Sequence, residues 1–207
     1  MASSLTDLER EVRACPLCRL CQTRINAVPG TGDAAARVMI VGEAPGQKED
    51  VSGEPFVGAA GQLLNRLLAS IGVAREGVYI TNIVKCRPPA NRDPLPDEVL
   101  ACSPYLDRQV DLIRPDVILL LGRHAVQRLL PGSEGISRIH GTLVERDGRA
   151  YVPLYHPAAA LYNGFLVQTL EADFERVRGY LDVIEARRVA AAAAPGSRGK
   201  EQQLSLF

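Results

Sequence analysis

The ten residues RVMIVGEAPG, at positions 37–46, determine how the rest of the chain is interpreted. Residues 37–42 form a largely apolar run without the polar alternation of a half-exposed strand, which predicts a strand buried on both faces. A turn containing glycine and proline follows directly. Because buried strands of this kind belong to parallel sheets, whose ligands bind beyond the strand ends, we expect residue 43 to begin a binding loop.

Apolar runs alternate with helical patterns through the middle of the chain. We predict strands at residues 78–82, 117–121 and 152–155, helices at residues 58–70, 97–113, 124–130 and 167–189, and a hairpin around residues 146–149. This alternation predicts a three-layer α/β/α sandwich with a central, mainly parallel sheet. The loops expected at the ligand-binding edge are residues 43–57, 82–96 and 156–164.

Length and composition restrict the class of protein. The chain has 207 residues and a formal net charge of zero, which predicts one soluble domain, residues 1–189, followed by a flexible linker and end peptide at residues 190–207. The sequence contains neither a secretory signal pattern nor an apolar run of the roughly 18 residues that span a bilayer. We therefore expect a cytoplasmic monomer without membrane contact. The neutral charge weighs mildly against nucleic-acid binding, although a local basic patch would still allow it.

Five cysteines in a chain without a signal indicate metal binding better than disulfides. Cys15 and Cys18 form a CxxC pair, and Cys86 and Cys102 lie far downstream. Four thiolates suit either zinc or an iron–sulfur cluster, and the spacing alone does not separate the two. Buried free cysteines are the plain alternative. The fifth, Cys21, leaves a second CxxC register open.

Further motifs follow the opening stretch in a distinctive order. GEAPG at residues 42–46 is followed by PFVG at 55–58, TNIVKCRPP at 81–89 and HPAA at 156–159. In this combination the chain resembles the family 4 uracil-DNA glycosylases, the iron–sulfur branch of their superfamily, from Cys15 to about Asp173. The resemblance implies an α/β sandwich that removes uracil from DNA. It also implies a 4Fe–4S cluster held by Cys15, Cys18, Cys86 and Cys102, with Cys21 as a bystander.

Candidate uracil-binding residues fall in the three expected loops. A base must leave the stack to be cut out, so a close-fitting pocket is required. Phe56 offers an aromatic face, although packing in the core is its alternative role. Asn82 can read the polar edge of uracil, and His156 can stabilise the negative charge of the leaving base. Backbone groups of Glu43 and Ala44 can reach the uracil oxygens.

Two carboxylates are candidates for positioning the attacking water. Family 1 glycosylases have an aspartate at the position that Ala44 occupies here. Either Glu43 or Glu49 then positions the water, or stabilisation of the leaving uracil provides most of the rate enhancement. We favour the second route, with an oxocarbenium-like transition state, and rank Glu43 above Glu49 as the water-positioning group.

Contacts with DNA outside the pocket are expected at two places. The loop carrying Leu161 and Tyr162 should enter the minor groove, with Leu161 as the wedge. A basic patch is expected beside Cys86, formed by Lys85, Arg87 and Arg92. His140 is expected in a DNA-contacting loop and His124 on a helix surface.

The chain ends in QLSLF, which resembles the short peptide by which bacterial proteins bind the sliding clamp of DNA polymerase. Leucine and phenylalanine side chains would fill an apolar pocket of the clamp, and a flexible linker would tether it. The predicted contacts are Gln203, Leu204, Leu206 and Phe207.

Two alternatives to uracil removal stay open. One is a non-catalytic module that binds DNA lesions and carries a structural zinc. The other is a glycosylase of the same superfamily that prefers another deaminated base, such as hypoxanthine.

Overall fold

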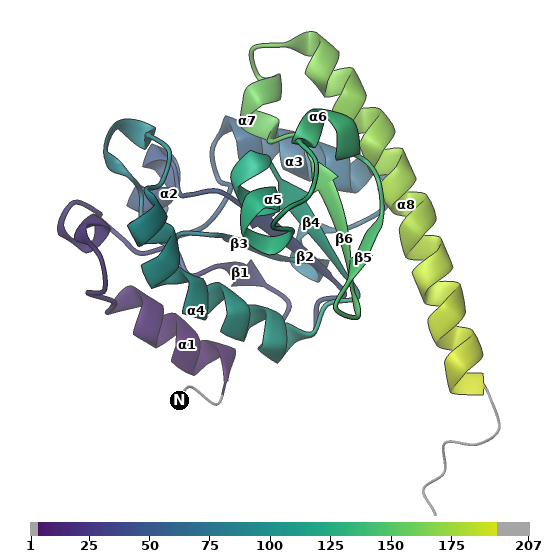
Figure 1. Cartoon of the computed structure of the whole chain (residues 1–207), viewed down its shortest axis with the longest axis horizontal. Coiled ribbons are helices and arrows are strands. Elements are labelled where there is room, and N and C mark those ends of the chain that lie inside the picture. Colours follow the sequence, from purple (N-terminus) through teal and green to yellow (C-terminus); the bar gives the residue numbers. More distant parts are fainter. Residues whose placement is uncertain (1–3, 194–207) are drawn as a thin grey trace, which may run out of the picture.

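The computed structural model describes residues 4–193, with side chains described as far as residue 190 (Figure 1). A six-stranded sheet lies at its centre, in the order β1-β3-β2-β4-β6-β5. The four inner strands β3, β2, β4 and β6 are parallel, and the two edge strands are antiparallel to their neighbours. The strands are β1 (Thr31–Gly32), β2 (Val38–Gly42), β3 (Tyr79–Asn82), β4 (Val117–Leu121), β5 (Val144–Arg146) and β6 (Arg149–Leu154).

Helices cover both faces of the sheet and complete a three-layer sandwich (Figure 1). Side chains of α1 (Leu5–Arg13), α4 (Pro96–Ile113) and α5 (Arg123–Leu129) belong to the core on one face. Side chains of α3 (Ala59–Ser70), α7 (Pro157–Ala160) and α8 (Gly164–Ala193) belong to the core on the other. Shorter helices are α2 (Gln47–Ser52), α6 (Ile136–Ile139) and the 3₁₀ turns Arg19–Gln22, Arg75–Gly77 and Pro89–Asn91.

The run of residues 37–42 shows why the sheet needs two helical layers. Successive side chains of a strand point to opposite faces. Accordingly, Met39 and Val41 pack into the core beneath α1 and α4, while Val38 and Ile40 pack into the core beneath α3 and α8. All five residues of β2 are buried, so the sequence pattern and the packing agree.

The predicted fold class is confirmed. The structure adds elements that were not predicted, among them α1, α2 and β1, and it shifts the ends of others. The hairpin between β5 and β6 turns at Asp147 and Gly148, whose φ angles of 52° and 73° suit a tight two-residue turn. The final helix begins at Gly164 rather than residue 167 and ends at Ala193. It therefore includes the first four residues, 190–193, of the stretch predicted as linker, because alanine is the best helix former. The predicted clamp-binding peptide lies outside the described residues.

Within residues 4–193, no helix combines the length and the apolar character that crossing a bilayer requires.

Candidate functional site

A cavity of about 400 Å³ opens beyond the carboxyl ends of β2 and β3. This is the size of a small-molecule site, and it lies at the edge where parallel sheets bind their ligands. The three loops predicted from the sequence meet here. The residues of the predicted uracil site that line it are Glu43, Ala44, Glu49, Phe56, Asn82 and His156.

Close packing at the end of β2 shapes one wall of the cavity. A Cβ atom on Gly42 would lie 2.4 Å from Oδ1 of Asn82 and 2.7 Å from the ring of Phe56. Any larger residue would displace both groups. Phe56 itself has a φ of 54°, a conformation that is uncommon for residues other than glycine. The site therefore carries local backbone strain at the aromatic residue that faces the cavity.

The Asn82 side chain has an unused hydrogen-bond acceptor. Asn82 is 1% exposed, and its Oδ1 is the single buried side-chain oxygen or nitrogen without a partner in the part of the chain that the structure describes. An unpaired buried acceptor costs free energy, so native proteins rarely keep one without a function. Its place in the wall of the cavity indicates a ligand that donates a hydrogen bond.

His156 is the N-cap of α7 and stacks on Phe56. Its Nδ1 accepts a hydrogen bond from the main-chain N–H of Ala158 over 3.1 Å, and its ring centre lies 5.6 Å from that of Phe56 at an interplanar angle of 25°. Burial lowers the pKa of His156 to about 4, against the opposing effect of the Glu49 carboxylate. The ring is therefore neutral near pH 7. Because Nδ1 accepts a hydrogen bond, Nε2 carries the proton and is the available donor.

Glu49 secures the loop that carries Phe56. Its Oε1 accepts hydrogen bonds of 2.9 Å from the main-chain N–H groups of Val57 and Gly58. These groups precede α3, whose first N–H groups otherwise lack partners. One oxygen of Glu49 is thus already hydrogen-bonded to the loop. Glu43, which also lines the cavity, is the carboxylate with more capacity to bind a water molecule there.

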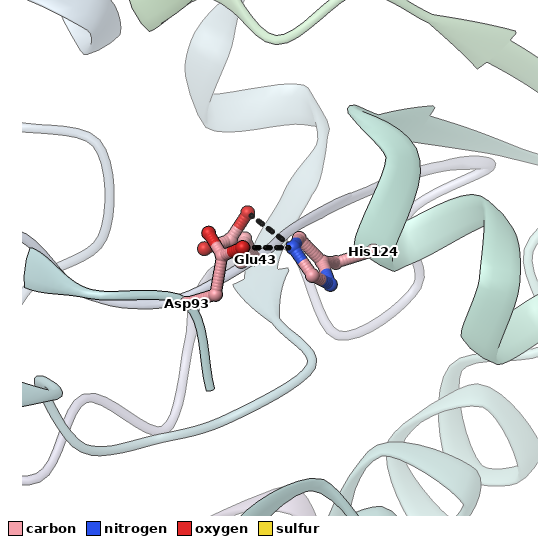
Figure 2. Close-up of side chains that lie close together, drawn as sticks. All are labelled: Glu43, Asp93 and His124. Atoms are coloured by element: carbon pink, nitrogen blue, oxygen red, sulfur yellow. Dashed lines mark ion pairs between the residues drawn. The ribbon is translucent and has the colours of Figure 1, made fainter. Parts of the chain in front are cut away.

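Glu43 lies in a charged cluster at the rim, together with Asp93 and His124 (Figure 2). Nε2 of His124 lies 3.3 Å from Oδ2 of Asp93 and 3.7 Å from Oε2 of Glu43. Burial raises the pKa of Glu43, the charge of His124 opposes this, and Asp93 adds to it. His124 was expected on a helix surface, but its side chain is 18% exposed and faces the pocket rim. Its position just beyond β4, at the carboxyl edge of the sheet, was the sequence signal that could have identified it.

All five cysteines line a second cavity, between α1, the turn Arg19–Gln22 and α4. Cys86 and Cys102 are buried, and Cys15, Cys18 and Cys21 are partly buried. Apolar side chains complete the lining, from Val12, Leu20 and Val84 among others. Segments far apart in the sequence therefore converge on one sulfur-rich, largely apolar site.

The spacing of the sulfur atoms bears on which metal could bind. Zn–S bonds of about 2.3 Å would bring the four sulfurs of a zinc site to within about 4 Å of one another. Among the described residues, Glu43, Asp93 and His124 form the one group of three potential ligands whose atoms all lie within 4.8 Å. No trio of cysteine sulfurs among those residues is therefore as close as 4.8 Å, and thiolates in this largely apolar cavity suit zinc or an iron–sulfur cluster. In addition, Nη1 of Arg24 donates a hydrogen bond of 3.0 Å to Sγ of Cys86.

The predicted basic patch requires a correction. Lys85 is 1% exposed, and its Nζ donates to Oγ1 of Thr81 at 2.6 Å, the carbonyl of Asn82 at 2.7 Å and Oε1 of Gln109 at 2.6 Å. A DNA phosphate cannot reach it, so its prediction as a DNA contact was wrong. The interior position arises because Lys85 follows the buried turn after β3 and points back into it.

The two arginines of that patch differ from Lys85. Arg92 forms a two-pronged ion pair with the buried Glu98, at 2.7 and 2.9 Å, and it also lines the uracil-site cavity. Nε of Arg87 donates to Oδ1 of Asn91 over 2.7 Å, in an exposed setting. Arg87 therefore stays a candidate phosphate contact, whereas most of the charge of Arg92 is already balanced.

The remaining predicted DNA contacts lie at the start of α8 and beside it. Leu161 and Tyr162 are 41% and 94% exposed, in the connection between α7 and α8. Phe165, in the first turn of α8, is 74% exposed beside them. His140 is partly buried, with Nδ1 held 2.7 Å from Oδ2 of the buried Asp173. The apolar connection is thus open to a partner, whereas the His140 ring is already held by a carboxylate of its own chain.

The fold and the first cavity together define an α/β protein with a small-molecule pocket at the carboxyl edge of its sheet. The chain belongs to the uracil DNA glycosylase superfamily, whose family model matches residues 29–181. It is 51% identical to the type-4 uracil-DNA glycosylase of Saccharolobus solfataricus, over 81% of this chain and 82% of that protein. It is 50% identical to the type-4 enzyme of Archaeoglobus fulgidus, over 84% and 92% respectively. A type-5 uracil-DNA glycosylase of Pyrobaculum aerophilum is more distant, at 34% identity over 66% and 67%.

Proposed function

We propose that this protein is a type-4 uracil-DNA glycosylase, which hydrolyses the bond between uracil and deoxyribose and leaves an abasic site. The unpaired Oδ1 of Asn82 carries the proposal. Uracil presents an N3–H donor at its pairing edge, whereas the corresponding nitrogen of cytosine is an acceptor. Binding of cytosine would leave two acceptors facing each other in a buried place, which strongly disfavours it.

The bond broken in the reaction joins N1 of uracil to C1′ of the sugar, and its electron pair goes to the base. Phe56 supplies a face on which the extruded base stacks. Nε2 of neutral His156 donates to the uracil O2, where negative charge develops as the bond lengthens. A hydrogen bond that strengthens as the charge grows lowers the barrier, because it stabilises the transition state more than the bound substrate.

A water molecule then adds to C1′ of the oxocarbenium-like sugar, and the proton that it loses passes through solvent to the uracil anion, which leaves as neutral uracil. We assign the positioning of this water to the Glu43 carboxylate, since one oxygen of Glu49 is engaged with Val57 and Gly58. Glu43 lines the same cavity, and its side chain is 29% exposed. Departure of a stabilised uracil anion provides most of the rate enhancement in this proposal.

The cysteine cavity would hold the 4Fe–4S cluster through Cys15, Cys18, Cys86 and Cys102. Four thiolates in a largely apolar cavity suit such a cluster, and the similarity to type-4 uracil-DNA glycosylases supports it over a structural zinc. The hydrogen bond from Arg24 to Sγ of Cys86 is of the kind that tunes cluster potentials. When bound, the cluster would join segments that are distant in sequence.

The DNA strand would meet the exposed connection between α7 and α8. We propose Leu161 as the wedge that enters the space left by uracil, with Tyr162 beside it and Arg87 on the backbone. Their exposure supports this role, because an apolar side chain exposed in free protein gains burial when it enters the base stack.

The test is release of uracil from a uracil-containing oligonucleotide, followed by alkaline cleavage of the abasic strand. With enzyme in excess, the strand should be cut, and matched strands carrying cytosine or thymine should stay intact. A strand carrying hypoxanthine distinguishes the alternative substrate preference. An uncut uracil strand, with the cysteine site fully loaded with iron, would refute the proposed activity.

A further inference from the structure

The rim cluster of Glu43, Asp93 and His124 comes from three separate parts of the fold (Figure 2). Glu43 follows β2, Asp93 precedes α4, and His124 lies in the first turn of α5. Their side chains converge although they share no sequence motif. His124 has no role in the binding of uracil described above, yet its imidazole faces the carboxylate assigned to the attacking water.

His124 has two sets of partners at the same nitrogen. As a cation, it would pair through Nε2 with Asp93 at 3.3 Å and Glu43 at 3.7 Å. As a neutral ring, Nε2 would instead accept a hydrogen bond from Nε of Arg123, 3.1 Å away. Arg123 is also ion-paired with Asp93. The proton on His124 therefore decides whether the ring supports the Glu43 carboxylate.

Glu43 needs such support because of where it lies. It is partly removed from water, and burial disfavours the charged form of a carboxyl group and raises the pKa of Glu43. The groups that act on it from neighbouring elements are His124 and Arg123, which favour its charge, and Asp93, which opposes it. Arg123 is ion-paired with Asp93, whereas Nε2 of His124 lies between the two carboxylates, 3.3 Å from Asp93 and 3.7 Å from Glu43.

The turn that carries His124 is also fixed against the other key residue of the site. Gly122 immediately precedes α5, with a φ of 89°, and a Cβ atom there would lie 3.2 Å from Cβ of His156. The first turn of α5 thus packs against His156 through its backbone and faces Glu43 through a side chain. The same turn therefore lies against both His156 and Glu43.

We infer that His124 is a positioning residue that keeps the Glu43 carboxylate ionised and correctly oriented at the uracil pocket. The inference rests on the proposed function, since it concerns the reaction in which Glu43 would take part. His124 does not itself touch the base or the sugar. Its contribution is electrostatic, and it acts through Glu43.

The experiment measures single-turnover release of uracil from an oligonucleotide between pH 5 and pH 9. In the variant His124→Gln, loss of the positive charge raises the pKa of Glu43, so the acidic limb of the rate profile should move to higher pH by about one unit. Above that limb, the rate should approach that of the unmodified protein. The variant His124→Lys keeps a positive charge and should restore the original limb.

Two further variants make the result specific. Arg128→Gln removes one positive charge from the same helix, where Arg128 pairs with Asp107, and it should leave the profile unchanged. The double variant Glu43→Gln/His124→Gln should show the same profile as Glu43→Gln alone, because His124 then has no carboxylate to support. Circular dichroism and bound iron establish that each variant is folded.

A uniform drop at every pH in both His124→Gln and His124→Lys would overturn the inference, because a merely structural role predicts that pattern. Additive effects in the double variant would overturn it as well. In either case the unmodified protein would still release uracil, so the proposed function would stand. Failure of the unmodified protein to release uracil would refute both.

Discussion

The main-chain N–H of Ala158 donates a hydrogen bond to Nδ1 of His156 over 3.1 Å, and this contact determines which nitrogen of the ring carries a proton. Nδ1 must be unprotonated to accept, so Nε2 is the donor available to a bound base. Protonation of both nitrogens would break the contact. The low pKa of about 4, caused by burial, has the same effect of keeping the ring neutral.

His156→Ala should lower single-turnover uracil release on the order of 10²- to 10³-fold, because it removes a donor aimed at developing negative charge. The pH profile of the unmodified protein should show no loss from His156 between pH 6 and pH 8. Nitrogen-15 NMR of labelled histidine checks the tautomer directly. A neutral ring protonated at Nδ1 rather than Nε2, or unchanged turnover in the alanine variant, would contradict this role.

Titration of His156 should also affect stability. Its folded pKa lies below the unfolded value of about 6.5. The unfolded chain therefore takes up a proton that the folded protein does not as pH falls from about 6.5 towards 4, and the free energy of unfolding decreases over that range. His156→Asn should flatten this part of the curve of unfolding free energy against pH. An equally steep decrease in the variant would assign it to other groups.

Asn82→Leu should have opposite effects on activity and stability. Leucine has a similar size but leaves no unpaired acceptor, and Oδ1 of Asn82 has no partner in the free protein. We expect the free energy of unfolding, measured with urea, to increase by about 1 kcal/mol or more. Uracil release should fall sharply. A fall in stability would show that Oδ1 is already satisfied.

The matched control for that variant is Asn65→Leu, which makes the same substitution on the exposed side of α3. The Asn65 side chain accepts a hydrogen bond from Arg75 in an exposed setting. Its replacement should change the free energy of unfolding by no more than about 0.5 kcal/mol, as is usual at a protein surface. Uracil release should stay at the level of the unmodified protein.

Lys85→Met tests the interior position of this residue. The ammonium donates hydrogen bonds to three neutral oxygens, on Thr81, Asn82 and Gln109. Its loss leaves these buried acceptors without that donor, at a cost of about 1–3 kcal/mol each. Urea unfolding should show this loss. The dependence of DNA affinity on salt should stay unchanged, whereas Arg87→Gln should reduce its slope by about one. A reduced slope in Lys85→Met would restore it as a phosphate contact.

The four proposed cluster ligands can be separated from Cys21 by iron content. Cys86→Ser and Cys102→Ser should purify with little iron and without the brown colour of a cluster, because both lie in the buried part of the cavity. Cys21 lines the same cavity, and its assignment as a bystander rests on the family resemblance. Cys21→Ser should retain full iron. Loss of iron in that variant, with iron retained in Cys18→Ser, would exchange their roles.

The fold could be predicted from the sequence because its signals are local. The strand at residues 38–42 is buried on both faces, and an unbroken apolar run of this kind, alternating with helical patterns, is typical of a parallel sheet between two helical layers. Asn82 and His156 were found because their motifs lie at strand ends, and Phe56 was found through the PFVG motif of the family resemblance. Lys85 was misplaced because charge was taken as a sign of exposure. His124 was missed because its partners are distant in sequence and meet only in the folded chain.

Deletion of residues 203–207 tests the peptide at the chain end, whose prediction rests on its sequence alone. QLSLF combines a polar anchor with three apolar side chains, Leu204, Leu206 and Phe207, of the kind that fill a shallow apolar pocket. The truncated protein should lose binding to an immobilised bacterial sliding clamp, while uracil release from a short oligonucleotide stays unchanged. The double substitution Leu206→Ala/Phe207→Ala keeps the length of the chain and should lose binding equally, because tethering multiplies an affinity only where the peptide itself binds. Clamp binding that survives both changes would place the contact elsewhere on the protein.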